Sequence, residues 1–280
     1  MNPPVAFLPT ATDPGLDHQA WQETLELLEW PLVCQHLSDF TSTRMGRDAA
    51  RTLELPVSLA ASSQRLAETV EMVVLDDLSE GGLSFRGVVD LRPVLLRCSK
   101  GGVAAGEELL GVAETLAAAR RLRRQIDQPD LRPVCTALIE RMVTLPELEQ
   151  RLKFALEEGG RVADRASAPL AVLRQQWQGL RQERRDKLQE MLRRLGTVLQ
   201  DTVIAERHGR PVLAVKAGAV SQVPGQVHDS SASGSTLFVE PRSVLSIGNR
   251  LVDLEARIRD EERKVLAELS GHVSEEEPTL

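Results

Sequence analysis

Apolar residues recur every three to four positions along most of the chain, and this spacing predicts a mainly helical protein. The clearest stripe lies in residues 243–273, and its members are Val244, Ile247, Leu251, Leu254, Ile258, Val265 and Leu269. A second stripe lies in residues 169–201, and its members are Leu170, Leu173, Trp177, Leu180, Leu188, Met191, Leu195 and Val198 or Leu199. Because the stripes have similar lengths, we expect two long helices that pair antiparallel through a coiled-coil-like seam.

A different pattern separates the two stripes. Short apolar runs at residues 203–205, 211–215 and 237–239 alternate with turn residues, which is typical of strands. His208-Gly209 and Pro224-Gly225 are expected to form two of the turns. The serine-rich residues 230–235 are expected to form a third, in which the hydroxyls bond nearby backbone groups. A small β region is therefore predicted at about residues 202–241.

The N-terminal half shows shorter helical segments, which predict a bundle over residues 19–168. In the segment at residues 59–78, Leu66, Val70, Val73 and Val74 are expected to form the buried stripe. Another predicted helix ends on four arginines, which are Arg120, Arg121, Arg123 and Arg124. Basic residues complement the dipole at a helix C-terminus, so a structural role is favoured over the alternative of nucleic-acid binding.

Composition limits the surface that could bind nucleic acid. A formal net charge of −7 argues against a protein that binds nucleic acid over its whole surface, so any contact must be local. Aromatic residues make up only 3% of the chain and tyrosine is absent, which leaves few candidates for base stacking. Residues 161–200 carry nine Lys or Arg against four Asp or Glu. This bias fits a solvated helix face as well as it fits phosphate contacts.

The three cysteines, Cys34, Cys98 and Cys135, are far apart and form no C-x-x-C pair. We interpret them as reduced, buried thiols, which fits a cytoplasmic location. No apolar run approaches the roughly 20 residues of a membrane span, so a membrane partner is not expected. Residues 1–18 contain four prolines and lack a basic start, and they are expected to be a disordered extension rather than a targeting peptide.

No catalytic or metal site is expected. His208 and His228 have no cysteine beside them, and Asp229 or Glu240 could complete a metal site only by accident of folding. A serine nucleophile from residues 230–235 cannot form a triad with its sequence neighbours His228 and Asp229, and no G-x-S-x-G motif occurs. No G-x-x-x-x-G-K-[ST] motif occurs either.

Residues 227–241, with the sequence VHDSSASGSTLFVEP, carry the most informative motif. Over about residues 24–273, the chain resembles the N-terminal half of the second bacterial MutS type, a MutS paralogue that lacks the mismatch-reading domain. Weaker matches support the resemblance through their order and spacing. They are TLE at 24–26, T-x-x-G at 43–46, VDLR at 89–92, KGG at 100–102, D-x-A-S at 164–167 and R-x-x-R at 207–210.

The resemblance implies a fold and a set of partners. The fold is a MutS-like core helical bundle plus two long antiparallel lever helices that carry a small β clamp. The implied parts are a disordered extension (1–18), the core bundle (19–168), an ascending lever helix (169–201), a β-rich clamp (202–242), a returning lever helix (243–273) and a truncated tail (274–280). Full-length members resemble dimeric ATPases that use ATP and Mg²⁺ and have a C-terminal endonuclease domain. No cofactor is expected in this segment.

The expected function is to grip branched DNA, or the rRNA of collided ribosomes, without catalysis in this segment. The candidate nucleic-acid-binding residues are Arg207, Arg210, Lys216, His228 and Arg242. The first three are expected to line one face of the β region. The alternative is a structural coiled-coil arm that docks protein partners, for which the apolar stripes alone suffice.

Overall fold

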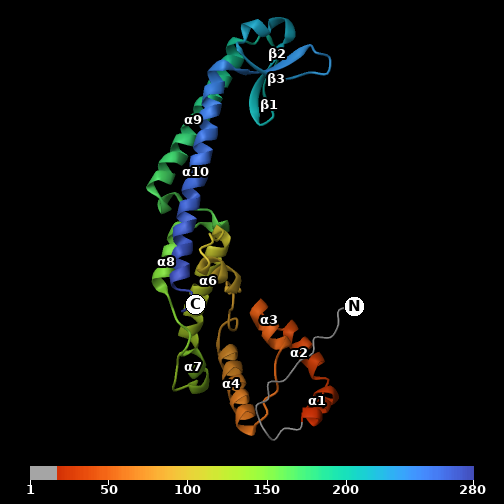
Figure 1. Cartoon of the computed structure of the whole chain (residues 1–280), viewed down its shortest axis with the longest axis vertical. Helices are drawn as coiled ribbons and strands as arrows, with labels where there is room; N and C mark the ends of the chain where they lie inside the picture. The colour runs from red at the N-terminus through yellow and green to blue at the C-terminus, as the bar shows by residue number, and fades with distance from the viewer. Residues whose placement is uncertain (1–17) are drawn as a thin grey trace. The chain divides into compact units, whose positions relative to one another are not determined.

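The computed structural model describes residues 18–280, so the expected extension at residues 1–18 lies outside the described residues except for His18. The described part is mainly helical and contains one four-stranded antiparallel sheet (Figure 1). The helices are α1 (His18–Leu27), α2 (Trp30–Asp39), α3 (Arg44–Arg51), α4 (Leu59–Leu78), α5 (Arg92–Ser99), α6 (Gly106–Ile126), α7 (Pro133–Ile139), α8 (Pro146–Ala155), α9 (Ala168–Arg194) and α10 (Arg242–Glu275). The strands are β1 (Leu199–Arg207), β2 (Arg210–Lys216), β3 (Gly225–Ser230) and β4 (Thr236–Pro241).

The chain divides into two compact units. The first unit contains the residues up to Arg161 together with Ala267–Leu280, and the second unit is Val162–Leu266. Helices α1–α8 therefore belong to the first unit, whereas α9, the sheet and most of α10 belong to the second.

Helix α6 forms the centre of the first unit. Its buried side chains include Leu109, Val112 and Leu116, and α8 packs along it. Gly106 begins α6 where the backbone of Gly160 passes so closely that a Cβ on either residue would overlap the other segment. Glycine is required at such a close approach because any side chain would force the two backbones apart.

The arginines at the end of α6 have structural partners. Both Nε and Nη2 of Arg120 donate to the buried carboxylate of Glu149 at 3.0 Å, and Lys153 donates to the same carboxylate at 2.7 Å. The Arg121 guanidinium donates to the backbone carbonyl of Arg86, and Arg123 donates to that of Met142. The structural interpretation of these three arginines is confirmed, since each holds another segment of the first unit.

The expected buried stripe of α4 is exposed. Leu66 is 66% exposed and Val70 is 61% exposed, and Val73 and Val74 are also exposed. The helix instead buries Leu75 against Leu122, Ile126, Cys135 and Ile139. On that side, the Glu71 carboxylate accepts hydrogen bonds from the backbone amides of Val134 and Cys135 at 3.2 and 2.7 Å. Spacing identifies an apolar face, but burial requires a partner, and here the partner α7 covers a different face.

All three cysteines are free and buried, which confirms the expectation of reduced, buried thiols. Burial, together with the neighbouring Glu71 carboxylate, raises the pKa of the Cys135 thiol to about 11. Since only the thiolate reacts, Cys135 is expected to resist alkylation by iodoacetamide at pH 8 in the folded chain and to react fully in urea. Peptide mass spectrometry checks this, and rapid labelling of native Cys135 would contradict the described packing.

The second unit combines the sheet with two long helices. The strand order is β1-β2-β4-β3 and every neighbouring pair is antiparallel. Helices α9 and α10 lie side by side with the sheet at one end (Figure 1). Between the helices lies a cluster of Leu173, Leu180, Ile247, Leu251 and Leu254, with Trp177 and Ile258 against it.

The expected fold class is wrong in its arrangement. Mainly helical content is observed, but the sheet is not a separate clamp carried by lever helices. One buried cluster joins the sheet to both helices, and it contains Leu188 of α9, Val244 of α10, and Leu199, Leu213, Val215, Val223 and Val239. Helix α9 also ends at Arg194, so Leu199 and Gln200 belong to β1 rather than to an ascending helix.

The described part of the first unit shows how its first three helices pack. Helices α1–α3 pack on one another, and no extensive packing joins them to α4–α8. Leu27, Leu28 and Phe40 in or beside these helices are exposed. A stripe of apolar residues does not specify which element will cover it, which is the physical reason for the corrected arrangement.

Candidate functional site

A tight turn brings two of the candidate cations together. His208 has a φ of 52° and Gly209 a φ of 72°, as a two-residue type I′ hairpin requires. Arg207 and Arg210 are therefore direct cross-strand partners at the ends of β1 and β2. Directly paired residues share a face, and so do residues an even number of positions apart on one strand. Arg207, Arg210 and Lys216 consequently lie on one face, as the sequence predicts.

Arg210 and His228 converge on a single buried carboxylate. Glu240 in β4 is 0% exposed, and its Oε2 lies 2.8 Å from Nε2 of His228. Its Oε1 lies 3.4 Å from Nη1 of Arg210, which also donates to Oδ1 of Asn249 at 3.3 Å. A buried charge must be paired and hydrogen-bonded. These two candidate residues are thus partners of Glu240 within the fold.

Two glycines allow neighbouring segments to approach Glu240. A Cβ on Gly225, the first residue of β3, would overlap the backbone carbonyl of Glu240. A Cβ on Gly248 of α10 would lie 3.2 Å from Oε1 of Glu240 and 3.1 Å from Nη1 of Arg210. The chain backbone therefore closes over the ion pairs from both β3 and α10, which explains why the carboxylate is fully buried.

Arg207 is the candidate cation with the most unusual surroundings. Its guanidinium carbon lies 4.0 Å from the centroid of the Phe238 ring, and its Nε donates to Oδ2 of Asp229 at 3.1 Å. Arg207 is in the edge strand β1, Asp229 is in the opposite edge strand β3, and Phe238 is in β4 between them. The sheet must coil for one edge to reach the other. The contact nonetheless stays accessible, since 37% of the Arg207 side chain and 43% of the Asp229 side chain are exposed.

Lys216 and Arg242 lie at the exposed margin of the same unit. Lys216 is exposed at the end of β2 and donates through Nζ to the backbone carbonyl of Thr197 at 3.0 Å. Arg242 is exposed at the first residue of α10, and its backbone amide donates to the carbonyl of Pro224 at 2.9 Å. The Lys216 contact uses one of the three ammonium donors, and the Arg242 contact uses only the backbone amide. Both side chains can therefore offer charge to a polyanion.

The serine-rich segment between β3 and β4 forms a turn, as predicted. Gly234 adopts a φ of 68°, and the amide of Thr236 donates to the hydroxyl of Ser231 at 3.1 Å. Ser233 hydrogen-bonds through its hydroxyl to the hydroxyl of Ser235 at 2.7 Å. His228 faces Glu240 rather than these hydroxyls. The described contacts therefore contain no serine–histidine pair in this segment.

Metal sites and membrane spans are two further possibilities for the described residues, 18–280. Within that range, no group of three or more His, Cys, Asp or Glu side chains is placed to hold a metal ion. In the same range, no helix has an apolar stretch that could cross a bilayer.

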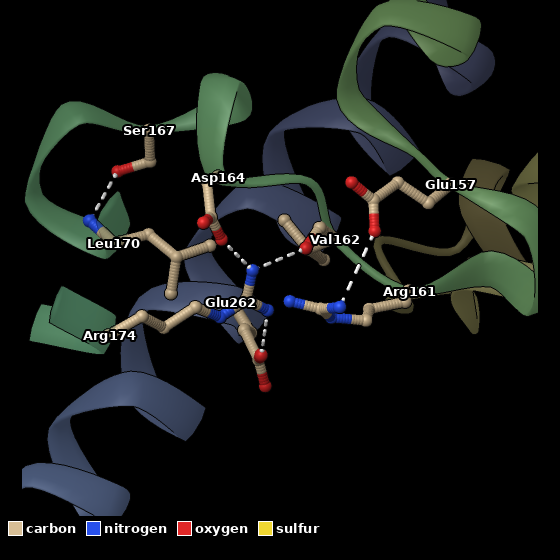
Figure 2. A network of polar contacts seen from close by, with 8 residues as sticks. All are labelled: Glu157, Arg161, Val162, Asp164, Ser167, Leu170, Arg174 and Glu262. Atoms are coloured by element: carbon tan, nitrogen blue, oxygen red, sulfur yellow. Dashed lines mark hydrogen bonds and ion pairs between the residues drawn. The ribbon is translucent and has the colours of Figure 1, made fainter. Parts of the chain in front are cut away.

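A second polar network organises the start of α9 (Figure 2). The buried Arg174 guanidinium donates to the carbonyl of Val162 at 2.8 Å, to the carboxylate of Asp164, and to Oε1 of Glu262 at 2.6 Å. Ser167 caps α9 by accepting from the amide of Leu170 at 3.4 Å. One arginine thus joins the entry loop, α9 and α10 of the second unit.

Sequence reasoning missed Phe238, Asn249 and the partners of Arg174. Phe238 is the only aromatic residue between positions 199 and 241, which is a signal that could have identified it. The role of Glu240 had no such signal, because Arg210, His228 and Glu240 meet only through the strand order of the folded sheet.

Comparisons with known proteins give one consistent result. No protein-family model matches the chain. The chain is 43% identical over 254 residues to Endonuclease MutS2 of Synechocystis sp., an alignment that covers 91% of this chain and 31% of that protein. It is 36% identical over 262 residues to Endonuclease MutS2 of Symbiobacterium thermophilum, covering 92% of this chain and 33% of that protein.

A third relative, Endonuclease MutS2 of Pelotomaculum thermopropionicum, is 35% identical over 91% of this chain and 33% of its own length. The chain thus spans about a third of the length of the curated relatives it matches. The resemblance expected from residues 227–241 is confirmed to this extent. The chain is a homologue of proteins named Endonuclease MutS2, matched over about a third of their length.

Proposed function

We propose that this chain is a nucleic-acid-binding part of a MutS2-like ATPase and that this part binds without catalysis. The observation that carries the proposal is the 43% identity, over 91% of the chain, to a protein whose name is that of an endonuclease. An endonuclease acts on nucleic acid, so a shared segment without reacting groups is best explained as a binding segment. We propose that the chain corresponds to the N-terminal part of such a protein.

The proposed contact surface is formed by accessible cations on one face of the sheet and at the start of α10. Arg207 and Lys216 share that face, and Arg242 is exposed at the start of α10. Three cations of the second unit can contact several phosphates even though the whole chain has a net charge of −7. Arg210 and His228 are assigned to the contacts with Glu240 instead, because the Arg210 guanidinium already pairs with that carboxylate and the His228 ring already hydrogen-bonds to it.

The proposed targets are branched DNA or the rRNA of collided ribosomes, in the cytoplasm. Both combine a dense phosphate backbone with interrupted base pairing. The complete protein is proposed to bind ATP and Mg²⁺ and to dimerise, and these activities are assigned to the two thirds of the relatives' length that this chain does not match.

Neutralising Arg207, Lys216 and Arg242 together by glutamine is expected to weaken nucleic-acid binding. Each lost phosphate contact lowers the slope of log affinity against log salt by about 0.9, so the triple variant should lose about two to three from the slope. Fluorescence anisotropy with a labelled four-way DNA junction and a labelled rRNA hairpin, from about 50 to 200 mM salt, measures this slope.

The matched control removes the same charge elsewhere. Lys100, Arg124 and Arg141 are exposed residues of the first unit, and replacing all three by glutamine changes the net charge equally. We expect that control to bind like the unmodified chain. Equal losses in both triple variants would mean that binding follows net charge alone. If the unmodified chain binds neither probe, the proposal is contradicted and the protein-docking arm becomes the better account.

A further inference from the structure

We propose that Phe238 is a stacking site for one unpaired nucleobase and that the Arg207 guanidinium occupies this site when no nucleic acid is bound. The inference rests on the proposed function, because it names the kind of nucleic acid that the sheet would recognise. It predicts a preference for strands with unpaired bases over continuous duplex.

The position of Phe238 in β4 separates its ring from the buried cluster of the sheet. Leu237 and Val239 on either side contribute to that cluster, so the side chain between them points to the opposite face. Phe238 is only partly buried. Its neighbours in β4 on that face, Thr236 and Glu240, are buried, so the ring is the accessible part of a largely covered face.

The ring is covered by a charged group that can leave. The guanidinium of Arg207 stacks on it with a distance of 4.0 Å from the guanidinium carbon to the ring centroid. The accompanying ion pair to Asp229 is 3.1 Å long and joins two side chains that are both more than a third exposed. Exposed cation–π contacts and exposed ion pairs are each weak. Stacking of a base on an aromatic ring is generally the stronger contact, so a base can replace the guanidinium.

The neighbours of the ring suit a nucleotide. Its direct cross-strand partner in β2 is Ala214, a small side chain that is itself buried. The next pair on the same face is Lys216 with Thr236, which places a flexible cation one step along the strand. When Arg207 leaves the ring, its guanidinium is free to pair with the phosphate of the stacked nucleotide, since arginine binds phosphate through two parallel hydrogen bonds.

Hydroxyls border the same end of the sheet. The turn between β3 and β4 presents Ser231, Ser233 and Ser235, and their hydroxyl oxygens form a chain with distances of 3.4 and 2.7 Å. Hydroxyls of this kind donate to phosphate or sugar oxygens and carry no sequence information. The sheet thus offers the Phe238 ring for a base, Arg207 and Lys216 for the phosphate backbone, and a turn of hydroxyls. Proteins that bind single strands without sequence preference use the same kinds of contact.

The test compares two probes of the same sequence, a single strand of about 12 nucleotides and the corresponding blunt duplex. In the 280-residue chain, replacing Phe238 by leucine should weaken binding of the single strand by about tenfold and binding of the duplex by less than about twofold, because only the unpaired base can stack. Phe154 on α8 is exposed and lies in the first unit, so Phe154→Leu is the matched control and should change neither affinity.

A second variant does not depend on the stability of the leucine replacement. Phe238→Trp retains an aromatic ring and adds a fluorophore, and the added emission should be quenched when the single strand binds but not when the duplex binds. Suppose that the unmodified chain binds both probes, that Phe238→Leu keeps the single-strand affinity and that the emission of Phe238→Trp is not quenched. The stacking site is then refuted, whereas the proposed function stands. If the unmodified chain binds neither probe, the proposed function fails as well.

Discussion

Replacing Glu240 by alanine is expected to destabilise the second unit by about 3–5 kcal/mol. The carboxylate is fully buried and is the shared partner of Arg210 and His228. Its loss leaves the cation of Arg210 without its buried counter-charge and also opens a cavity. Urea unfolding, followed by far-ultraviolet circular dichroism, measures the change in the free energy of unfolding.

Two further variants make the Glu240 result specific. Glu240→Gln keeps the size of the side chain but removes its charge, so it should lose about 2 kcal/mol because the hydrogen bonds to Arg210 and His228 become neutral on one side. Glu206 is an exposed glutamate of β1, and Glu206→Ala should change stability by less than about 0.5 kcal/mol. A loss in Glu240→Ala no larger than the loss in Glu206→Ala would contradict the buried ion pairs.

Replacing Arg174 by alanine is expected to cost about 3 kcal/mol. The substitution leaves the carbonyl of Val162 and the carboxylates of Asp164 and Glu262 without their shared donor (Figure 2). Lysine should restore less than half of this loss, because one ammonium group cannot reproduce the planar fork of donors that joins three acceptors.

The control for Arg174 lies on the same helix. Arg185 is exposed on α9, and Arg185→Ala should be nearly neutral. Urea unfolding of the three variants gives the comparison. If Arg174→Lys is as stable as the unmodified chain, the three acceptors do not need a forked donor and the account of this network is wrong.

Local features of this chain could be predicted from its sequence because a few residues determine them. His208-Gly209 predicts a two-residue turn because both positions must adopt positive φ, and the turn is observed. The apolar spacing of residues 169–201 predicts a long helix, and α9 begins at Ala168. Leu173 and Leu251 lie in one cluster between α9 and α10, as their spacing suggests.

Features that depend on a distant partner could not be predicted. The stripe of Leu66 and Val70 on α4 has helical spacing, but the neighbouring α7 packs on the face that contains Leu75. Leu199 continues the apolar spacing of α9 but is paired with Val215 in the sheet, which favours a strand. Tertiary pairing overrides local propensity at both positions.

The candidate site shows the same division between local and distant information. Alternation along β2 is local, so the shared face of Arg210 and Lys216 followed from the sequence. The convergence of Arg210 and His228 on Glu240 did not, because it requires the strand order β1-β2-β4-β3 and an irregularity in β3 between Val227 and Asp229. Phe238 was passed over because the low aromatic content of the whole chain obscured a local exception.

The claim that the sheet of the second unit contacts nucleic acid is tested most directly by photo-crosslinking. The 280-residue chain would be irradiated with a thiothymidine-substituted single strand, and the cross-linked peptides would be identified by mass spectrometry. We predict cross-links within residues 199–242, with Phe238 among the modified positions and with competition by unlabelled strand. Cross-links confined to α1–α8 of the first unit, with none in residues 199–242, would contradict the account.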